Sequence, residues 1–586
     1  MLMFHHLFHP LRVLWDGRIT FFWPIWLSIT SLAVILAVWI VSAKSNKAPL
    51  EQSESSRQQD RPRESIGWVV ALGLLLVCYV GGILAWEDFT YYDNSHFTSE
   101  TLVGRDISLQ VSPIAGRFWP LGHQEFNLLR HITNSISGYH ALRILQLIAV
   151  CSILLVLDKQ LDIRVRVALI FLLLITPGIV ISFSGLIYPE ANVIVCLVCL
   201  AWSVDRFGRT PSLLWAVVAV LSAQLLLYYK ETAFLFVLGF AGGRIVLRCR
   251  KNNEGGWDWK HLRDPESRLD VLLVGLVGVF LLYYFAALYP HFGGGYEKEH
   301  KLPLLTVLGT YLELDLLLCI FVSVCAVRAF LVFRRRLAPW QFWDGLAFGG
   351  ILYLCGYLVL GIESSYYLAP VDFIAVLYIG RLAILSVPGM GLSIRLGALA
   401  LLFLVCVQDF SLSAFRMYER KNIVRGKAEV GRAIKDRYEN DPQSVKRLFF
   451  PTATPFSILE FASYLQYIGV PIEQRANNTG AADGVLLVGR SIQSDGPCGY
   501  RAYLCHPGSI PNSGDLVVVL PDDITSVEET NSYRKESSVF LFSYDPRPSI
   551  SQSMRPIVNR LHAESPIFAF RQLPDSWLMA SVSVWR

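Results

Sequence analysis

Long apolar runs recur along this chain from residue 20 to residue 409. A helix needs about 20 apolar residues to cross a hydrocarbon core that is roughly 30 Å thick. Charged residues make up only 17% of the sequence, whereas soluble proteins usually contain about 25%. The sequence therefore predicts an α-helical polytopic membrane protein with about twelve transmembrane helices. We place them at 20–43, 67–86, 142–157, 166–183, 191–204, 212–229, 232–247, 270–288, 304–333, 345–362, 370–388 and 395–409.

Lysine and arginine gather in alternate loops between these predicted helices. The loops that carry them are 44–66, 158–166, 205–211, 244–269 and 334–344. Loops 184–190 and 363–369 contain neither residue. Because short cytoplasmic loops are enriched in lysine and arginine, we assign the first set to the cytoplasm. The C-terminal region then lies outside. This topology fits a bacterial inner membrane with the C-terminal region in the periplasm. A membrane of the endoplasmic reticulum would satisfy the same topology.

The chain divides into three regions by this pattern. Residues 1–66 supply an extra N-terminal transmembrane helix and a polar cytoplasmic linker, and residues 67–409 form the main transmembrane domain. Residues 410–586 contain short apolar runs, such as GVLLVGR and DLVVVLP, that alternate with helical patterns. Such alternation is typical of α/β domains. We expect a soluble α/β domain there, with a role in scaffolding or acceptor recognition.

The chain has 11 cysteines, and most lie in or beside the apolar spans, where cysteine behaves as a small hydrophobic residue. Cys498 and Cys505 instead lie in the polar C-terminal region. Their close spacing and an oxidising compartment outside the membrane would allow a disulfide between them. Two free thiols or a pair of metal ligands remain alternatives.

The predicted outer loop at 87–141 is far longer than a connector between two helices requires. It is rich in aromatic residues and carries several titratable ones, among them Glu87, Asp88, Asp93, His96, Arg117 and His131. This mixture is typical of an amphipathic segment that lies on the membrane surface. An acidic pair at a helix end can also be a simple solvated cap, and a loop histidine can be a surface residue.

Three further titratable residues fall on the outer side of the predicted helices. Glu190 follows Tyr188 and Pro189 at the start of one helix, and Lys230 and Glu231 separate two others. An acidic residue at a helix N-terminus is favourable for the helix dipole alone. However, ionisable groups at membrane depth are costly and by default indicate a functional site. All of these residues converge on the outer face.

These features together resemble the GT-C superfamily of membrane glycosyltransferases, in particular the protein O-mannosyltransferase and aminoarabinose transferase type. The resemblance covers residues 67–409 and rests on the early acidic pair, the GRFWPL stretch, the Pro-Glu at 189–190 and the Lys-Glu at 230–231. It implies transfer of a sugar from a polyprenyl-phosphate donor on the non-cytoplasmic face, to a glycan, lipid or protein acceptor. The order Glu-Asp and the additional N-terminal helix depart from the family's usual plan.

The resemblance implies a role for each candidate residue. The first-loop acid of the family is the catalytic base or helps to hold a metal, which here assigns the base to Asp88 or Glu87 and allows a divalent cation, Mg or Mn, without naming its ligands. Loss of the phosphate leaving group requires cationic partners, for which Arg117, Lys230 and His131 are candidates. Sugar hydroxyls require carboxylates and hydrogen-bonding side chains, for which the candidates are Glu190, Glu231, Asp93 and His96.

Three other interpretations remain open. A transporter or flippase for a lipid-linked or small substrate would show internal repeats and broken helix pairs. An O-antigen-type polymerase or ligase would carry its large outer loop late in the chain, with arginine and histidine as its signature. A membrane scaffold with an outer binding domain would need none of the titratable residues. The net charge of +5 is small for 586 residues, and it gives no indication of nucleic acid as a partner.

Overall fold

The structure is a computed structural model that describes most of the helical region and parts of the C-terminal region. The described residues are 22–42, 62–84, 101–102, 104–112, 116–157, 161–250, 257–288, 303–362, 365–384, 400, 405, 413, 422–451, 455–472, 485–490, 504–506, 511–520, 537–544 and 580–585. Glu87, Asp88, Asp93, His96 and Cys498 lie outside these residues. The predicted span at 395–409 also lies almost wholly outside them.

Six described helices are long and apolar enough to cross a membrane: α2 (Phe22–Ser42), α6 (Ile136–Leu157), α9 (Glu190–Arg209), α12 (Pro265–Leu288), α15 (Leu316–Phe333) and α16 (Gln341–Leu360). A bent pair, α7 (Ile163–Leu174) and α8 (Pro177–Ser184), would make a seventh. Other helices of this region are α3 (Pro62–Leu84), α10 (Leu213–Tyr229), α11 (Ala233–Cys249), α14 (Leu304–Leu314) and α17 (Ser365–Ile384). The protein is therefore a helical, membrane-embedded protein. Twelve spans remain a prediction.

Two segments that we predicted as continuous helices are broken. The predicted helix at 166–183 bends by 71° between α7 and α8, because Pro177 begins α8 and has no N–H to donate to the preceding turn. The predicted helix at 304–333 breaks at Asp315, whose side chain accepts a hydrogen bond from the Leu318 N–H at the start of α15. Aspartate favours such a cap over a place within a helix.

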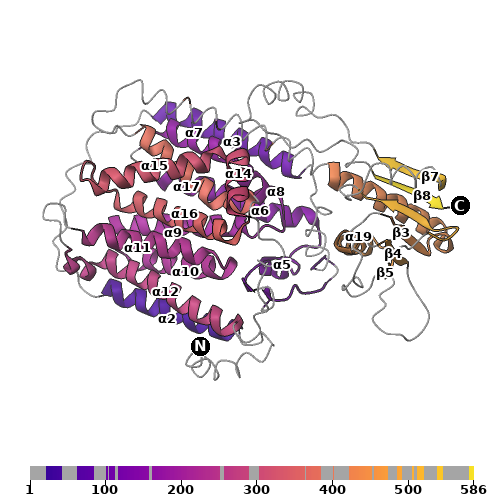
Figure 1. The fold of residues 1–586 in the computed structure, drawn as a ribbon, viewed down its shortest axis with the longest axis horizontal. Helices are drawn as coiled ribbons and strands as arrows, with labels where there is room; N and C mark the ends of the chain where they lie inside the picture. The colour runs from indigo at the N-terminus through magenta and orange to yellow at the C-terminus, as the bar shows by residue number, and fades with distance from the viewer. Residues whose placement is uncertain are drawn as a thin grey trace.

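The helices run side by side, from α2 and α12 at one edge of the bundle to α3 and α7 at the other (Figure 1). At the centre, α11 packs closely on α16. Glycines make this approach feasible, because a Cβ added to Gly349 would lie 2.8 Å from the Phe236 carbonyl oxygen of α11. Small residues at such crossings let helix backbones come close together in membranes.

The described part of the outer loop folds over one end of this bundle. Strands β1 (Val111–Ser112) and β2 (Arg117–Phe118) pair antiparallel, and α5 (Gln124–Leu129) follows. Phe118 and Phe126 are fully buried. The loop aromatics that the structure describes here therefore pack largely inside the protein, although we expected an interfacial segment, because the outer ends of the helices leave apolar side chains for them to cover.

The C-terminal region contains a six-stranded sheet in the order β5-β4-β3-β6-β8-β7. The strands are β3 (Arg447–Phe450), β4 (Leu486–Arg490), β5 (Leu504–His506), β6 (Leu516–Val519), β7 (Ser537–Tyr544) and β8 (Ala580–Trp585). The four strands from β5 to β6 are parallel, and β8 is antiparallel to both of its neighbours. Helix α19 (Pro455–Tyr467) contributes to the core beside the sheet. Leu102 and Ile136 also pack against this core, so it contacts the outer loop.

We expect Gly349→Ala to destabilise the protein by about 1–3 kcal/mol, the usual range for overpacking. The added methyl group would press on the backbone of α11, which cannot move without its helix. Thermal unfolding in detergent measures the change. Gly242→Ala on α11 is the matched control, because a Cβ there would meet no atom within 4 Å. An unfolding midpoint for Gly349→Ala equal to that of the control would contradict this packing.

Candidate functional site

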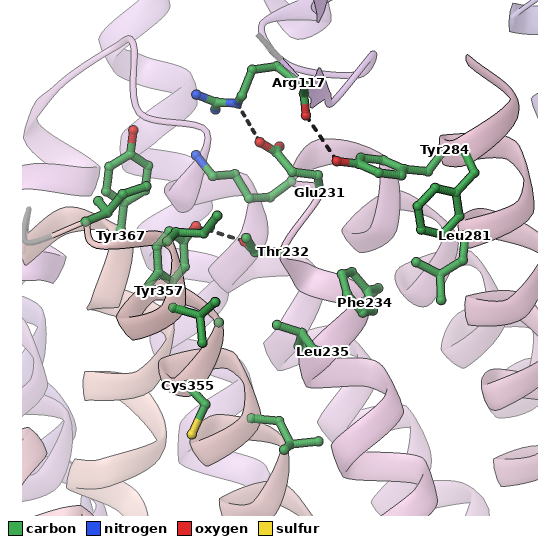
Figure 2. A pocket seen from close by; sticks show the side chains of 18 residues that line it. Arg117, Glu231, Thr232, Phe234, Leu235, Leu281, Tyr284, Cys355, Tyr357 and Tyr367 are labelled. Atoms are coloured by element: carbon green, nitrogen blue, oxygen red, sulfur yellow. Dashed lines mark hydrogen bonds and ion pairs between the residues drawn. The ribbon is translucent and has the colours of Figure 1, made fainter. Parts of the chain in front are cut away.

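A cavity of about 580 Å³ lies at the N-terminal end of α11, between α12 and α16 (Figure 2). Helix α11 contributes Phe234 and Leu235, and the flanking helices contribute mainly apolar side chains. The polar end is formed by β2, by the turn between α10 and α11, and by the start of α17. Its lining residues there are Gly116, Arg117, Lys230, Glu231, Thr232, Tyr357 and Tyr367.

Arg117 and Glu231 form one ion pair at the polar end. The Arg117 Nε donates to Glu231 Oε1 at 2.5 Å, and both side chains are mostly buried. Burial alone would lower the pKa of the Arg117 guanidinium, but Glu231 together with Tyr367 and Tyr357 raises that pKa above its ordinary value. Burial likewise opposes ionisation of Glu231, yet Arg117 and Lys230 lower the pKa of its carboxyl. Both groups are therefore charged at neutral pH.

Lys230 and Glu190 form a second ion pair beside the first. The Lys230 Nζ lies 2.9 Å from Glu190 Oε1, and the two side chains are 4% and 0% exposed. The Lys230 ammonium also lies 4.3 Å from the centroid of the Tyr367 ring and 5.6 Å from that of Trp119. Cations are attracted to aromatic faces at such distances. The cavity therefore holds two cations, each balanced by its own carboxylate.

The local sequence explains why these groups meet. Lys230 has an extended backbone that ends α10, and Thr232 is the N-cap residue of α11, so the segment between them is a turn at the outer end of the bundle. Glu190 follows Pro189 in the first turn of α9. The Thr232 and Tyr357 hydroxyl groups lie 2.8 Å apart and fasten this turn to α16.

The outer loop is fastened to the same place. The Tyr284 hydroxyl of α12 donates to the Gly116 carbonyl oxygen at 3.1 Å, next to Arg117 (Figure 2). The Leu121 N–H donates to the Tyr228 carbonyl oxygen at 3.1 Å. These bonds fix the position of Arg117 relative to α10 and α12, although the loop and these helices are distant in sequence.

The opposite end of the cavity is apolar and open at the flank of the bundle. Phe285 of α12 is 52% exposed and Val359 of α16 is 67% exposed, and Cys355 of α16 is also exposed. The cavity therefore combines a charged end with an apolar groove that opens at the flank of the bundle.

The structure brings together four of the candidate residues, namely Arg117, Glu190, Lys230 and Glu231. His131 is exposed after α5 and does not line this cavity, and its role stays a prediction. The remaining candidates lie outside the described residues: Glu87, Asp88, Asp93, His96 and the Cys498 side of the predicted disulfide. Their roles remain predictions.

Sequence reasoning missed a buried polar network next to the site. The Arg143 guanidinium of α6 is fully buried, lies 3.3 Å from Glu125 Oε1 and donates to the Leu186 carbonyl oxygen at 2.6 Å. Asn192 of α9 donates to the same Glu125 oxygen at 2.6 Å. An arginine within an apolar span is itself a signal of such a network. The network joins α5 to α6 and α9, and so holds the loop against Glu190's helix.

His123 is a second residue that the sequence did not single out for the site. It is fully buried between Trp119 and Phe126. Its backbone is left-handed, with φ of 63°, a conformation in which histidine is enriched over most residues. Burial, with help from the Arg143 and Lys230 charges, lowers the pKa of His123 from 6.5 to about 3. His123 is therefore neutral at physiological pH.

Among the described residues, no group of three or more histidine, cysteine, aspartate or glutamate side chains could hold a metal ion. The carboxylates nearest the cavity, Glu190 and Glu231, are each engaged with a cation. The divalent cation suggested by the resemblance stays a prediction that concerns Glu87 and Asp88.

No protein-family model matches this chain, and no curated protein matches its sequence.

Acid should destabilise the protein through His123. Its pKa is lower in the folded state than in the unfolded chain, so its contribution to stability is complete above pH 6.5 and is lost as the pH falls toward about 3. We expect the unfolding temperature of the wild type to fall more steeply between pH 7.5 and pH 4 than that of His123→Asn, a residue that tolerates a left-handed backbone. His131→Asn, at an exposed position, should keep the wild-type slope. Equal slopes for all three proteins would contradict a buried neutral His123.

Proposed function

We propose that this chain is a glycosyltransferase that takes its sugar from a lipid-phosphate donor, of the polyprenyl-phosphate type, at the outer face of the membrane. The observation that carries the proposal is the cavity itself. It places two cations at one end of an apolar groove that opens on the flank of the bundle. Few soluble ligands need such a groove, whereas a lipid with a charged headgroup matches both ends.

The apolar groove suits an isoprenoid or acyl chain that enters from the bilayer. Its floor is α11 and its walls are α12 and α16, with exposed side chains at Phe285 and Val359. The donor would not have to leave the membrane to bind. Only its phosphate and sugar would reach the polar end, where the outer loop covers the site.

The cations Arg117 and Lys230 suit the phosphate of the donor. Arginine binds phosphate through its planar guanidinium, and lysine acts as a compact point charge. In the present state each is paired with a carboxylate, so a phosphate would take the place of Glu231 or Glu190 at its cation. The released carboxylate would then be available for the sugar hydroxyls.

The reaction would be a nucleophilic substitution at the anomeric carbon. The acceptor hydroxyl oxygen forms the new bond to this carbon, while the bond from the carbon to the phosphate oxygen breaks and its electron pair leaves with the phosphate. A carboxylate takes the proton of the acceptor hydroxyl, and we assign this base to Asp88 or Glu87. Arg117 and Lys230 stabilise the negative charge that develops on the leaving phosphate.

The acceptor would be a glycan, a lipid or a protein that reaches the outer face. The sheet region of residues 447–585 contacts the outer loop through Leu102 and Ile136, which suits a role in acceptor recognition. A multi-pass location in a bacterial inner membrane, with this region in the periplasm, belongs to the same proposal.

A second candidate function is transport of a lipid-linked or small substrate. It is favoured by the two broken helices, because transporters use discontinuous helices at their substrate and ion sites. Asp315 at the break between α14 and α15 is buried, and so is Asp372 on α17. These breaks do not line the cavity described above.

Arg117→Gln should lower sugar transfer by about 10²–10³-fold, the usual loss when one stabilising donor is removed from a developing anion. Transfer of radiolabelled sugar from a panel of polyprenyl-phosphate sugars, with the full-length protein in lipid, measures this. Arg130→Gln is the matched control, because Arg130 pairs with exposed Asp106 away from the cavity. Asp88→Asn in the same assay tests whether Asp88 is the catalytic base, in which case sugar transfer is lost.

Two outcomes would contradict the proposal. Transfer by Arg117→Gln at the rate of the Arg130→Gln control would remove Arg117 from the reaction. Movement of the labelled lipid across sealed vesicles, with no transfer from any donor, would favour the transporter.

A further inference from the structure

The end of the bundle opposite the cavity carries a surface of unusual charge and composition. We define the basic–aromatic patch as Trp257, Trp259, Lys260, Arg263 and the three arginines at 334–336. Every one of these residues is exposed. The two tryptophans are 52% and 60% exposed, and their rings stack with centroids 5.8 Å apart.

The two halves of the patch are joined by Arg250 at the end of α11. Arg250 pairs with Trp257 in an antiparallel bridge. Its Nη2 donates to the Phe333 carbonyl oxygen at 3.0 Å, and its guanidinium lies 5.6 Å from the centroid of the Phe333 ring. Phe333 directly precedes the three arginines. The tryptophans and the arginine run are therefore parts of one continuous surface, although 70 residues and more separate them in sequence.

The cations of the patch have no carboxylate partner among the residues that the structure describes. Within the described part of the chain, no carboxylate forms an ion pair with Lys260, Arg263 or the arginines at 334–336. Of the acidic residues nearby, Asp258 accepts a hydrogen bond from the Lys260 N–H, Asp264 contacts His261, and Glu266 pairs with Arg248. Five positive charges thus stand together beside two exposed indole rings.

We propose that the basic–aromatic patch binds the headgroups of anionic phospholipids in the leaflet that it faces. Tryptophan is enriched at the level of the lipid headgroups, and basic clusters at the ends of membrane helices attract anionic lipids. The positive-inside rule places both of its loops, 244–269 and 334–344, in the cytoplasm. The ligand chemistry is a phosphodiester with a net negative charge, held by several arginines and flanked by indole rings. This inference does not depend on the proposed function.

The test uses the full-length protein in phosphatidylcholine vesicles, with dibrominated phosphatidylglycerol or dibrominated phosphatidylcholine as the quencher of tryptophan fluorescence. We expect the anionic lipid to quench at a lower mole fraction than the neutral one. The change Arg334→Gln, Arg335→Gln and Arg336→Gln in one protein should reduce this preference by about 100-fold, because each cation near an anionic surface contributes roughly fivefold in affinity. Raising the ionic strength to 1 M should also reduce it, as the Debye length falls to about 3 Å.

The control removes the same charge from the C-terminal region, through Arg432→Gln, Lys435→Gln and Lys446→Gln, and should keep the wild-type preference. Trp257→Phe with Trp259→Phe should remove the part of the signal that belongs to the patch. If the arginine variant does not fold, Lys260→Gln with Arg263→Gln replaces it.

Equal quenching of the wild type by both lipids, or an unchanged preference in the patch variants, would overturn the proposal. Competition by poly-glutamate in place of the lipid would assign the patch to an acidic protein, and competition by inorganic phosphate to a free anion, and either would overturn it.

Discussion

Two buried ion pairs at the N-terminal end of α11 determine how the rest of the site is built. Arg117 meets Glu231, and Lys230 meets Glu190, in a place where water is largely excluded. Removing one partner of a buried pair typically costs about 3–5 kcal/mol, because the remaining charge has no compensation. Each pair also joins segments that are remote in sequence. The pairs therefore hold β2 of the outer loop against the turn before α11, and hold that turn against α9.

The same arrangement that orders the fold is suited to chemistry. The cations are pre-positioned by the Tyr284 bond to the loop and by the Thr232 contact with Tyr357. A phosphate that displaced a carboxylate from either cation would exchange one ion pair for another, and the released carboxylate would then be available to the sugar hydroxyls. The hydrogen-bond network around Arg143 stabilises the position of the loop beside these cations, because it joins α5 to α6 and α9. In the proposed function, the apolar groove would hold the lipid chain.

The membrane-embedded character of the chain could be predicted from the sequence, because a helix in lipid must satisfy its own backbone and therefore requires long apolar runs. The breaks at Pro177 and Asp315 were not predicted, since both lie within runs whose hydropathy continues across the break. Lys230 and Glu190 could be nominated as ionisable groups at membrane depth. Their pairing, and that of Arg117 with Glu231 across 114 residues, could not be predicted, because it depends on how the loop packs. His123 gave no signal, as its burial follows from the same packing.

The central claim is that a lipid phosphate binds along α11 with its chain between α12 and α16. Cys355 lies in this groove and is exposed, and Cys78 on α3 is exposed at a distance from it. The most direct measurement is the rate at which N-ethylmaleimide modifies each thiol, followed by mass spectrometry of the purified protein with and without a polyprenyl phosphate. Protection of Cys355 by the lipid, with Cys78 modified at an unchanged rate, is the expected result. Unprotected Cys355 at saturating lipid, or equal protection of both thiols, would contradict a lipid-phosphate site in this groove.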